Sequence, residues 1–416
     1  MYPDRSVSPS LLEYKNVIRP VRAELVDAAK GKVRFTNYYD FTALQDAVSG
    51  YYEVERDGEV VQSGLLPEIA AAPHESVEIT LDYKMPRKGN CFLNIVYVSR
   101  DDRPLVPSGH ELGRDQLTLR SEEIVLPEQK AKGEFKIQED EKELVVRSSD
   151  LRYTFNKLTG EWTHLVYKNQ ERLAQPMSFN IWRAPTDNDM YVRQEWKRCG
   201  YDRALPRVYS VKAKVKDGLC SVRCKMSLAP IYLQKILTLD VTYRIGSDGS
   251  MDVSVKAKKE AAMIDLPRFG LRLFLPKAMD QARYYGYGPY ESYVDKQRAS
   301  YMSRFETTAK ENHEDYIRPQ ENGSHYGCME AEVTNSHGTG VRALSEQGFS
   351  FNISCYTQEE LESKKHNFEL EESACSVVCL DYAMGGVGSN SCGPRLKEKY
   401  RFNPSKFTFH IRLEMV

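Results

Sequence analysis

The chain ends in the stretch FTFHIRLEMV at residues 407–416, and this stretch decides the fold class. Every second residue is apolar, which is the period of a strand with one buried face and one polar face. The buried face would carry Phe407, Phe409, Ile411, Leu413 and Met415. The same alternation recurs upstream in SMDVSVKA and CFLNIVYVS, so the sequence predicts an all-β chain.

The composition of the 416-residue chain narrows the classes of function. Its 58 basic and 59 acidic residues give a net charge of -1, which lacks the positive footprint of a nucleic-acid or polybasic membrane binder. No run approaches the roughly 20 apolar residues that span a bilayer, and the first residues do not resemble a signal peptide. Nine cysteines, an odd number, are typical of reduced thiols. We therefore expect a cytoplasmic protein with no nucleic-acid or membrane partner.

Three short helices are predicted between the strands. In SPSLLEYKNVI, Ser8 can cap the helix and Pro9 suits its first position, where a missing N–H costs nothing. In NDMYVRQEWKRCG, Asn188 or the aspartate after it can cap the helix, and Gly200 can end it. A third helix is expected to start at Thr357, followed three residues later by glutamate.

A charged, apolar-poor stretch near residue 125 divides the chain. The hundred or so residues before it alternate in short strands and turns, which is typical of an Ig-like β-sandwich. The residues after it keep the period of two to the end and predict a large second β domain. The predicted boundaries are residues 1–18 for a leading segment, 19–121 for the Ig-like sandwich, 122–136 for a linker and 137–416 for the large domain.

Two cysteine pairs are the only spacings that invite a metal interpretation. Cys220 with Cys224, and Cys375 with Cys379, are each spaced by four. Both pairs lie in strand-like runs, where cysteine serves as a small buried apolar side chain, and the histidines have no metal-ligand spacing. We predict no metal site in this chain and nine free thiols.

Three loops are candidate ligand sites, because no phosphate-binding loop or nucleophile elbow is present. YGYGPYESY at 284–292 and YAMGGVGSNSCGP at 382–394 combine glycines with aromatic and small polar residues, which lets backbone and amide groups approach a hydroxylated ligand. RAPTDND at 183–189 contains Arg183, Asp187, Asn188 and Asp189. These residues could bind sugar hydroxyls or a cation, or could cap the following helix, and the glycine loops could be plain turns.

Six motifs stand in order along nearly the whole chain. They are YPDRSVSPSLLEYK, RAPTDNDMY, GYGPYESY, RPQENGSHYGC, FNISCYTQEEL and DYAMGGVGSNSCGP. In this order they resemble the C-terminal part of a glycoside hydrolase family 2 β-galactosidase of the bacterial lactose-cleaving type. The resemblance implies that residues 1–18 are the exit from a catalytic (β/α)8 barrel. It also implies that residues 137–416 are the "small chain" β-supersandwich, whose fold is similar to aldose mutarotases.

The resemblance places the chemistry outside this chain. Retaining glycosidases use two carboxylates about 5 Å apart, and in the family both glutamates, with the magnesium and sodium ligands, lie on the barrel. The chain is therefore expected to be inactive alone and to hold no cofactor. Its expected partner is the barrel segment of the same enzyme, which hydrolyses β-galactosides. The complete enzyme is expected to be a homo-oligomer. Met1 followed by a barrel-exit motif favours an expressed fragment over a natural small subunit. Candidate pairs here, such as Glu291 with Glu321 or Glu359 with Glu360, have ordinary structural explanations.

The resemblance also implies that two loops form the aglycone-side rim of the substrate pocket. The first is the RAPTDND loop with its four polar residues. The second carries Asn390, Ser391 and Cys392, where the enteric enzyme places a tryptophan in the position of Cys392 as a stacking platform. Cysteine has no π-face, so we expect the aglycone to be held by hydrogen bonds from Asn390 and Ser391 instead.

Two other functions remain open at this point. One is a stand-alone carbohydrate-binding module, which would bind galactosides without the barrel. The other is a mutarotase-like epimerase, which would need His313 or His325 as an acid opposite Glu321 as a base.

Overall fold

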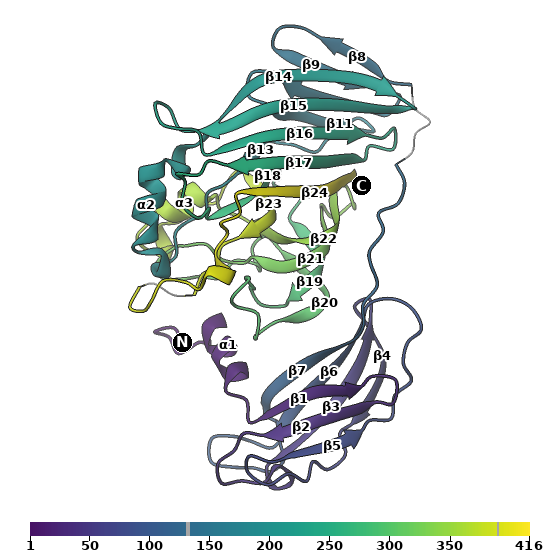
Figure 1. Cartoon of the computed structure of the whole chain (residues 1–416), viewed down its shortest axis with the longest axis vertical. Helices are drawn as coiled ribbons and strands as arrows, with labels where there is room; N and C mark the ends of the chain where they lie inside the picture. Colours follow the sequence, from purple (N-terminus) through teal and green to yellow (C-terminus); the bar gives the residue numbers. More distant parts are fainter. Residues whose placement is uncertain (130–133, 389–390) are drawn as a thin grey trace. The chain divides into compact units, whose positions relative to one another are not determined.

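The computed structural model describes residues 1–129, 134–388 and 391–416 (Figure 1). The chain divides into two compact units. The first unit contains Met1–Glu123 and two later segments, Tyr287–Tyr290 and Gln297–Arg304. The second unit contains Ile124–Gly286, Glu291–Lys296 and Phe305–Val416. The sequence did not indicate that the chain re-enters the first unit twice after residue 286.

The first unit is built from two antiparallel sheets, in the strand orders β1-β2-β5 and β4-β3-β6-β7. The strands are β1 (Val21–Asp27), β2 (Lys32–Asn37), β3 (Val48–Arg56), β4 (Glu59–Leu65), β5 (Ser76–Thr80), β6 (Cys91–Ser99) and β7 (Glu111–Arg120). Along β2 the side chains alternate, with Val33 and Phe35 fully buried and Arg34 exposed. The buried faces of the two sheets supply one apolar core, as alternating patterns require.

The remaining strands are linked by hydrogen bonds into one closed sheet. They are β8 (Lys136–Glu139), β9 (Glu143–Arg147), β10 (Leu151–Asn156), β11 (Glu161–Tyr167), β12 (Gln170–Glu171), β13 (Gln175–Asn180), β14 (Leu205–Lys216), β15 (Leu219–Ala229), β16 (Leu237–Ile245), β17 (Met251–Lys259), β18 (Arg268–Pro276), β19 (Gln281–Gly288), β20 (Tyr301–Thr308), β21 (His325–Thr334), β22 (Gly340–Ser354), β23 (Cys375–Met384) and β24 (Lys406–Met415). The predicted all-β class is confirmed.

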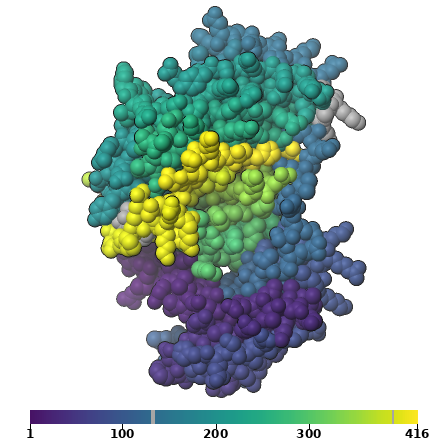
Figure 2. Space-filling model, in the orientation of Figure 1, coloured from purple at the N-terminus to yellow at the C-terminus, as the bar shows by residue number. Residues whose placement is uncertain are grey.

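The C-terminal strand β24 lies beside β17 in this sheet, where Figure 2 shows it as a yellow band across one face of the second unit. The five apolar residues predicted to be buried are all buried. The polar face, however, is not uniformly exposed. Arg412 is buried and paired with Asp252, with Nε 2.6 Å from Oδ1. Alternation therefore identified the strand but could not show that its other face is covered as well.

The described residues form three α-helices: α1 (Pro9–Val17), α2 (Val192–Cys199) and α3 (Gln358–Ser363). α1 starts at Pro9 as predicted, but the Ser8 hydroxyl makes no cap bond and instead accepts from the amino group of Met1 at 2.9 Å. α2 ends at Gly200, whose φ of 77° is left-handed, as predicted. α3 is capped by the Thr357 hydroxyl, which accepts the N–H of Glu360 at 3.1 Å.

The predicted cap of α2 is wrong. Asn188 and Asp189 lie in a separate 3₁₀ turn, and α2 begins only after Tyr191. The Asp189 carboxylate accepts the backbone N–H of Thr186 at 2.9 Å and so closes this earlier turn. The short 3₁₀ helices are η1 (Leu44–Asp46), η2 (Asp187–Asp189), η3 (Tyr201–Arg203), η4 (Asn367–Glu369) and η5 (Glu398–Tyr400).

All nine cysteines lie as free thiols. Cys220 and Cys224 are buried in β15, and burial raises the pKa of both to about 12. Within the described ranges, no helix has the length and apolar character needed to cross a bilayer.

Candidate functional site

The Arg183 guanidinium joins two loops of the second unit. Its Nε and Nη2 donate to the Asp189 carboxylate at 3.2 and 2.7 Å. Its Nη1 donates to the carbonyl of Gly385, and Nη2 donates to that of Gly386 at 3.1 Å. The guanidinium also lies over the Trp196 ring, 5.3 Å from its centroid. Arg183 is only 1% exposed, and its N–H groups hold the 183–189 loop against the 385–386 backbone.

A second link joins the two predicted rim loops. The Asn188 amide donates to the carbonyl of Val387 at 2.8 Å, and the Ser391 hydroxyl donates to Asn188 Oδ1 at 3.1 Å. Cys392 follows with an exposed thiol, 3.6 Å from the Ser391 hydroxyl. The structure thus brings Asn188 and Ser391 together, while Asn390 lies outside the described residues.

Of the two predicted rim aspartates, Asp187 has the more exposed carboxylate. Its side chain is 63% exposed and lies 3.9 Å from the Arg318 guanidinium, and its backbone N–H donates to Gln320 at 3.1 Å. Exposure therefore separates the candidates: Asp187 and Cys392 can be reached by a ligand, whereas Arg183 and Asp189 hold the loops from beneath. Sugar binding by any of them stays a prediction.

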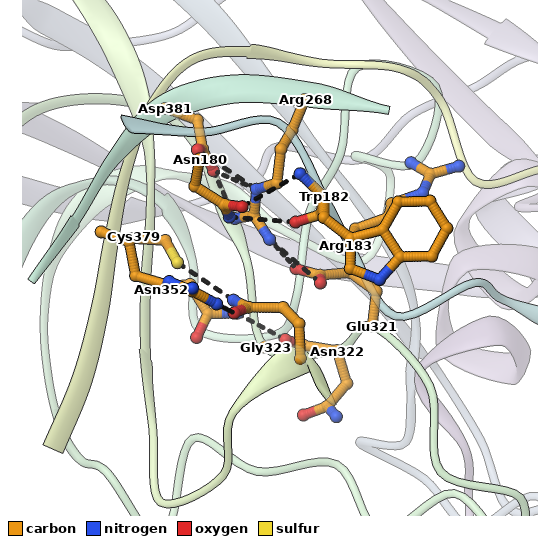
Figure 3. Close-up of polar contacts among 12 residues, drawn as sticks. Asn180, Trp182, Arg183, Arg268, Glu321, Asn322, Gly323, Asn352, Cys379 and Asp381 are labelled. Carbon is orange, nitrogen blue, oxygen red and sulfur yellow. Dashed lines mark hydrogen bonds and ion pairs between the residues drawn. The ribbon is translucent and has the colours of Figure 1, made fainter. Parts of the chain in front are cut away.

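A buried charge cluster beneath these loops was not expected from the sequence (Figure 3). Arg268 of β18 is fully buried and donates to Asp381 of β23 through Nε at 3.1 and 3.2 Å and through Nη2. Its Nη1 donates to both oxygens of Glu321 at 3.2 and 3.1 Å. Burial raises the pKa of Glu321, and the single Arg268 cation, shared with Asp381, offsets this only in part.

This cluster is continuous with the base of the RAPTDND loop. The backbone N–H of Glu321 donates to the carbonyl of Ala184 at 3.1 Å. The Asn180 amide donates to the carbonyl of Trp182 at 2.9 Å and accepts its N–H at 3.0 Å (Figure 3). Glu321 and Asp381 stand in two of the six motifs, whereas Arg268 stands in none. The arginine and the aspartate come from strands paired across more than a hundred residues, and no local pattern indicates that they meet.

Glu291 occupies a second buried site and is equally engaged. Its carboxylate accepts from the Lys296 ammonium at 2.6 Å, the Tyr293 hydroxyl at 3.2 Å and the N–H of Gly323 at 3.0 Å. It also accepts from the Tyr316 hydroxyl. Glu291 therefore has a full set of partners that explains its burial by structure alone.

The histidines needed for an epimerase are engaged elsewhere. His325 Nε2 lies 2.7 Å from the Asn312 side-chain oxygen, and its ring stacks on Tyr284 with centroids 4.1 Å apart. Burial lowers the pKa of His313, whose ring packs against Tyr356. Both carboxylate oxygens of Glu321 accept hydrogen bonds from Arg268.

Across the described residues, no three or more His, Cys, Asp and Glu side chains are placed to hold a metal ion.

The fold and the linked polar loops define the class, an all-β chain of a small sandwich followed by a large closed β domain. Two family models match these parts: "Beta-galactosidase, domain 4" over residues 33–120 and "Beta galactosidase small chain" over residues 147–413. The chain belongs to the β-galactosidase family.

Curated relatives match the chain from end to end. It is 42% identical over 416 residues to a β-galactosidase of Actinobacillus pleuropneumoniae, covering 100% of this chain and 40% of the relative. It is 30% identical to a β-galactosidase of Staphylococcus xylosus, covering 100% of this chain and 42% of the relative. The chain thus spans well under half the length of these relatives.

Two of the solved structures that match part of the chain are named as an epimerase and a putative epimerase. Galactose 1-epimerase from Lactobacillus acidophilus has 9% identity and a TM-score of 0.36, covering 68% of this chain and 98% of that chain. A putative aldose 1-epimerase from Escherichia coli has 8% identity and a TM-score of 0.36, covering 64% of this chain and 96% of that chain.

Proposed function

We propose that this chain is the non-catalytic C-terminal part of a glycoside hydrolase family 2 β-galactosidase, an enzyme that hydrolyses terminal β-D-galactosides with retention. The observation that carries the proposal is the similarity of the whole chain to only 40% of a β-galactosidase. The rest of such an enzyme would supply the catalytic segment. The complete enzyme would be a cytoplasmic homo-oligomer.

The described carboxylates support the proposal that catalysis belongs to the other segment of the enzyme. A retaining mechanism needs one carboxylate as nucleophile and another as acid/base, both facing the sugar. The buried candidates Glu291, Glu321 and Asp381 are each paired with a lysine or arginine and have at most 7% of their surface exposed. We infer that magnesium and sodium bind with the catalytic segment, and that this chain holds neither.

The role proposed for the chain at the active site is to form the aglycone-side rim. Cys392 and Asp187 supply accessible groups, and Asn188 with Ser391 supplies a hydrogen-bonded pair next to them. Arg183 and Asp189 support the rim by fixing its loops. Asn390 is included from the family resemblance alone.

A reconstitution assay tests the proposal. The purified chain should not hydrolyse nitrophenyl galactoside, and adding the separately expressed catalytic segment of the family should restore hydrolysis. The proposal is wrong if the chain alone turns over this substrate and loses the activity in Glu291→Gln or Glu321→Gln. Measuring galactoside binding and galactose mutarotation by the chain alone separates the two other functions.

A further inference from the structure

The stretch GYGPYESYVDK at residues 286–296 contains a tight turn with Val294 and Asp295 at its tip. The backbone N–H of Tyr293 donates to the carbonyl of Lys296 at 2.8 Å, and the N–H of Lys296 donates back at 3.0 Å. The side chains of both residues are bound by the buried Glu291 carboxylate. Both ends of the turn are therefore fixed from beneath, and Asp295 is held in place at the tip.

The Asp295 carboxylate binds the backbone of the 385–388 loop. Oδ1 accepts the N–H of Val387 at 3.0 Å, and Oδ2 accepts the N–H of Gly388 at 2.8 Å. The Asn188 amide holds the carbonyl of Val387 from its other side. With the two carbonyls bound by Arg183, consecutive backbone groups from Gly385 to Gly388 are held by side chains from two distant segments.

The glycines of this loop show how close the approach is. A Cβ added to Gly386 would lie 2.6 Å from the Asp295 carboxylate, and one added to Gly388 would lie 2.7 Å from its Oδ2. With a Cβ at either position the Asp295 carboxylate would have to move, so glycine at both positions lets the backbone approach it this closely. The glycines of the loop therefore allow its backbone to lie directly against the Asp295 carboxylate.

We propose that Asp295 is a positioning residue for the acceptor side of the active site. It holds Val387, whose carbonyl is bound by the Asn188 amide, and the same Asn188 side chain accepts a hydrogen bond from the hydroxyl of Ser391, next to Cys392. The proposal rests on the proposed function of the chain. Hydrogen bonds from backbone N–H groups to a carboxylate are stronger than neutral ones. A rim held in one conformation spends less entropy when a neutral sugar or alcohol acceptor binds.

Amide hydrogen exchange on the isolated chain tests the contact directly. Asp295→Ala removes both acceptors, so exchange at the Val387 and Gly388 amides should accelerate about tenfold or more. Asp295→Asn keeps one acceptor oxygen and should give an intermediate acceleration. Asp217→Asn, a matched change at a carboxylate that is 82% exposed, should leave both amides unchanged. Unchanged exchange in Asp295→Ala would refute the contact and the proposal.

Transfer to glucose in the reconstituted enzyme tests the positioning role. Asp295→Ala should raise the glucose concentration for half-maximal galactosyl transfer about tenfold, while inhibition by galactose changes less than twofold, since galactose occupies the other side of the site. A purely structural residue would shift both constants together, and that result, or no shift in either, would overturn the proposal. If the unsubstituted assembly is inactive, the proposed function fails and the positioning role fails with it, while hydrogen exchange still reports the contact.

Discussion

The two units bury very different side chains. In the first unit the buried charges among the described residues are few, with Arg19 and Asp115 as the ion pair near its core. Among its described residues, the second unit buries four arginines. These arginines are Arg172, Arg183, Arg268 and Arg412. Both units are held by an apolar core, and the second adds buried arginines that connect distant strands and loops. Arg183, Arg268 and Arg412 do so through ion pairs, and Arg172 through backbone carbonyls.

The difference follows from what each unit must hold in place. A small sandwich needs only two apolar faces, which non-directional packing supplies. The large domain also fixes loops whose backbone groups need directional partners, and a planar guanidinium offers several donors at once. Buried ion pairs gain little net stability over apolar packing, yet breaking one of them is costly.

The largest expected effect is that of Arg268→Ala. It should lower the free energy of unfolding of the second unit by about 3 to 5 kcal/mol, because Asp381 and Glu321 lose their only shared cation. Tryptophan fluorescence during urea unfolding measures this, since all three tryptophans lie in the second unit. Arg223→Ala, which breaks an exposed pair with Asp240, should cost at most about 1 kcal/mol. Equal losses in both variants would contradict the comparison.

In the first unit, the loss of a buried apolar side chain should lower stability more than the loss of an exposed charge. Leu93 is fully buried in β6, and Leu93→Ala should destabilise that unit by about 2 to 5 kcal/mol through lost transfer energy and a cavity. Circular dichroism should show the shifted transition, while the tryptophan transition of the second unit stays in place. A shift of the tryptophan transition by the same amount would show that the units unfold together.

At the rim, Cys392→Trp should add a stacking surface for the aglycone. Since the thiol is exposed, the larger ring has room, and acceptor binding in the reconstituted enzyme should tighten by about 0.5 to 1.5 kcal/mol more than galactose binding. Acceptor affinity and thermal midpoint are measured on the same variant. If stability falls by about 1 to 3 kcal/mol while acceptor affinity is unchanged, the bulky side chain has overpacked the loop and the rim assignment is wrong.

The buried cluster also predicts a pH dependence. Burial raises the pKa of Glu321 above its ordinary value of 4.5, so the folded state binds this proton more tightly than the unfolded state does. The stability linked to this group is therefore full below that value and is lost as the pH rises through the raised pKa. The stability advantage of the unsubstituted chain over Glu321→Gln should shrink as the pH is raised from the ordinary pKa of 4.5 upward through the raised pKa. An advantage that grows over this range would mean that Arg268 lowers the pKa instead.

Local patterns predicted the elements well where one residue decides a boundary. Gly200 ends α2 because a left-handed residue costs glycine nothing, and Thr357 caps α3 through its hydroxyl. The cap of α2 failed because the Asp189 carboxylate is also the partner of Arg183, a contact that depends on folding. The two rim loops were candidate ligand sites from their residues alone, and the resemblance assigned them to the aglycone side. Their division into accessible and buried groups required the structure.

The sequence by itself determined the all-β class, the strand faces and the family. Alternation and turn residues act over a few positions, and ordered motifs identify relatives without any coordinates. Only the tertiary structure decided which charges meet. Arg268 with Asp381, and Asp295 with the Gly388 backbone, are brought together across 113 and 93 residues. Contacts of this range depend on strand pairing and loop closure, and these are set by the packing of the whole domain and leave no local pattern in the sequence.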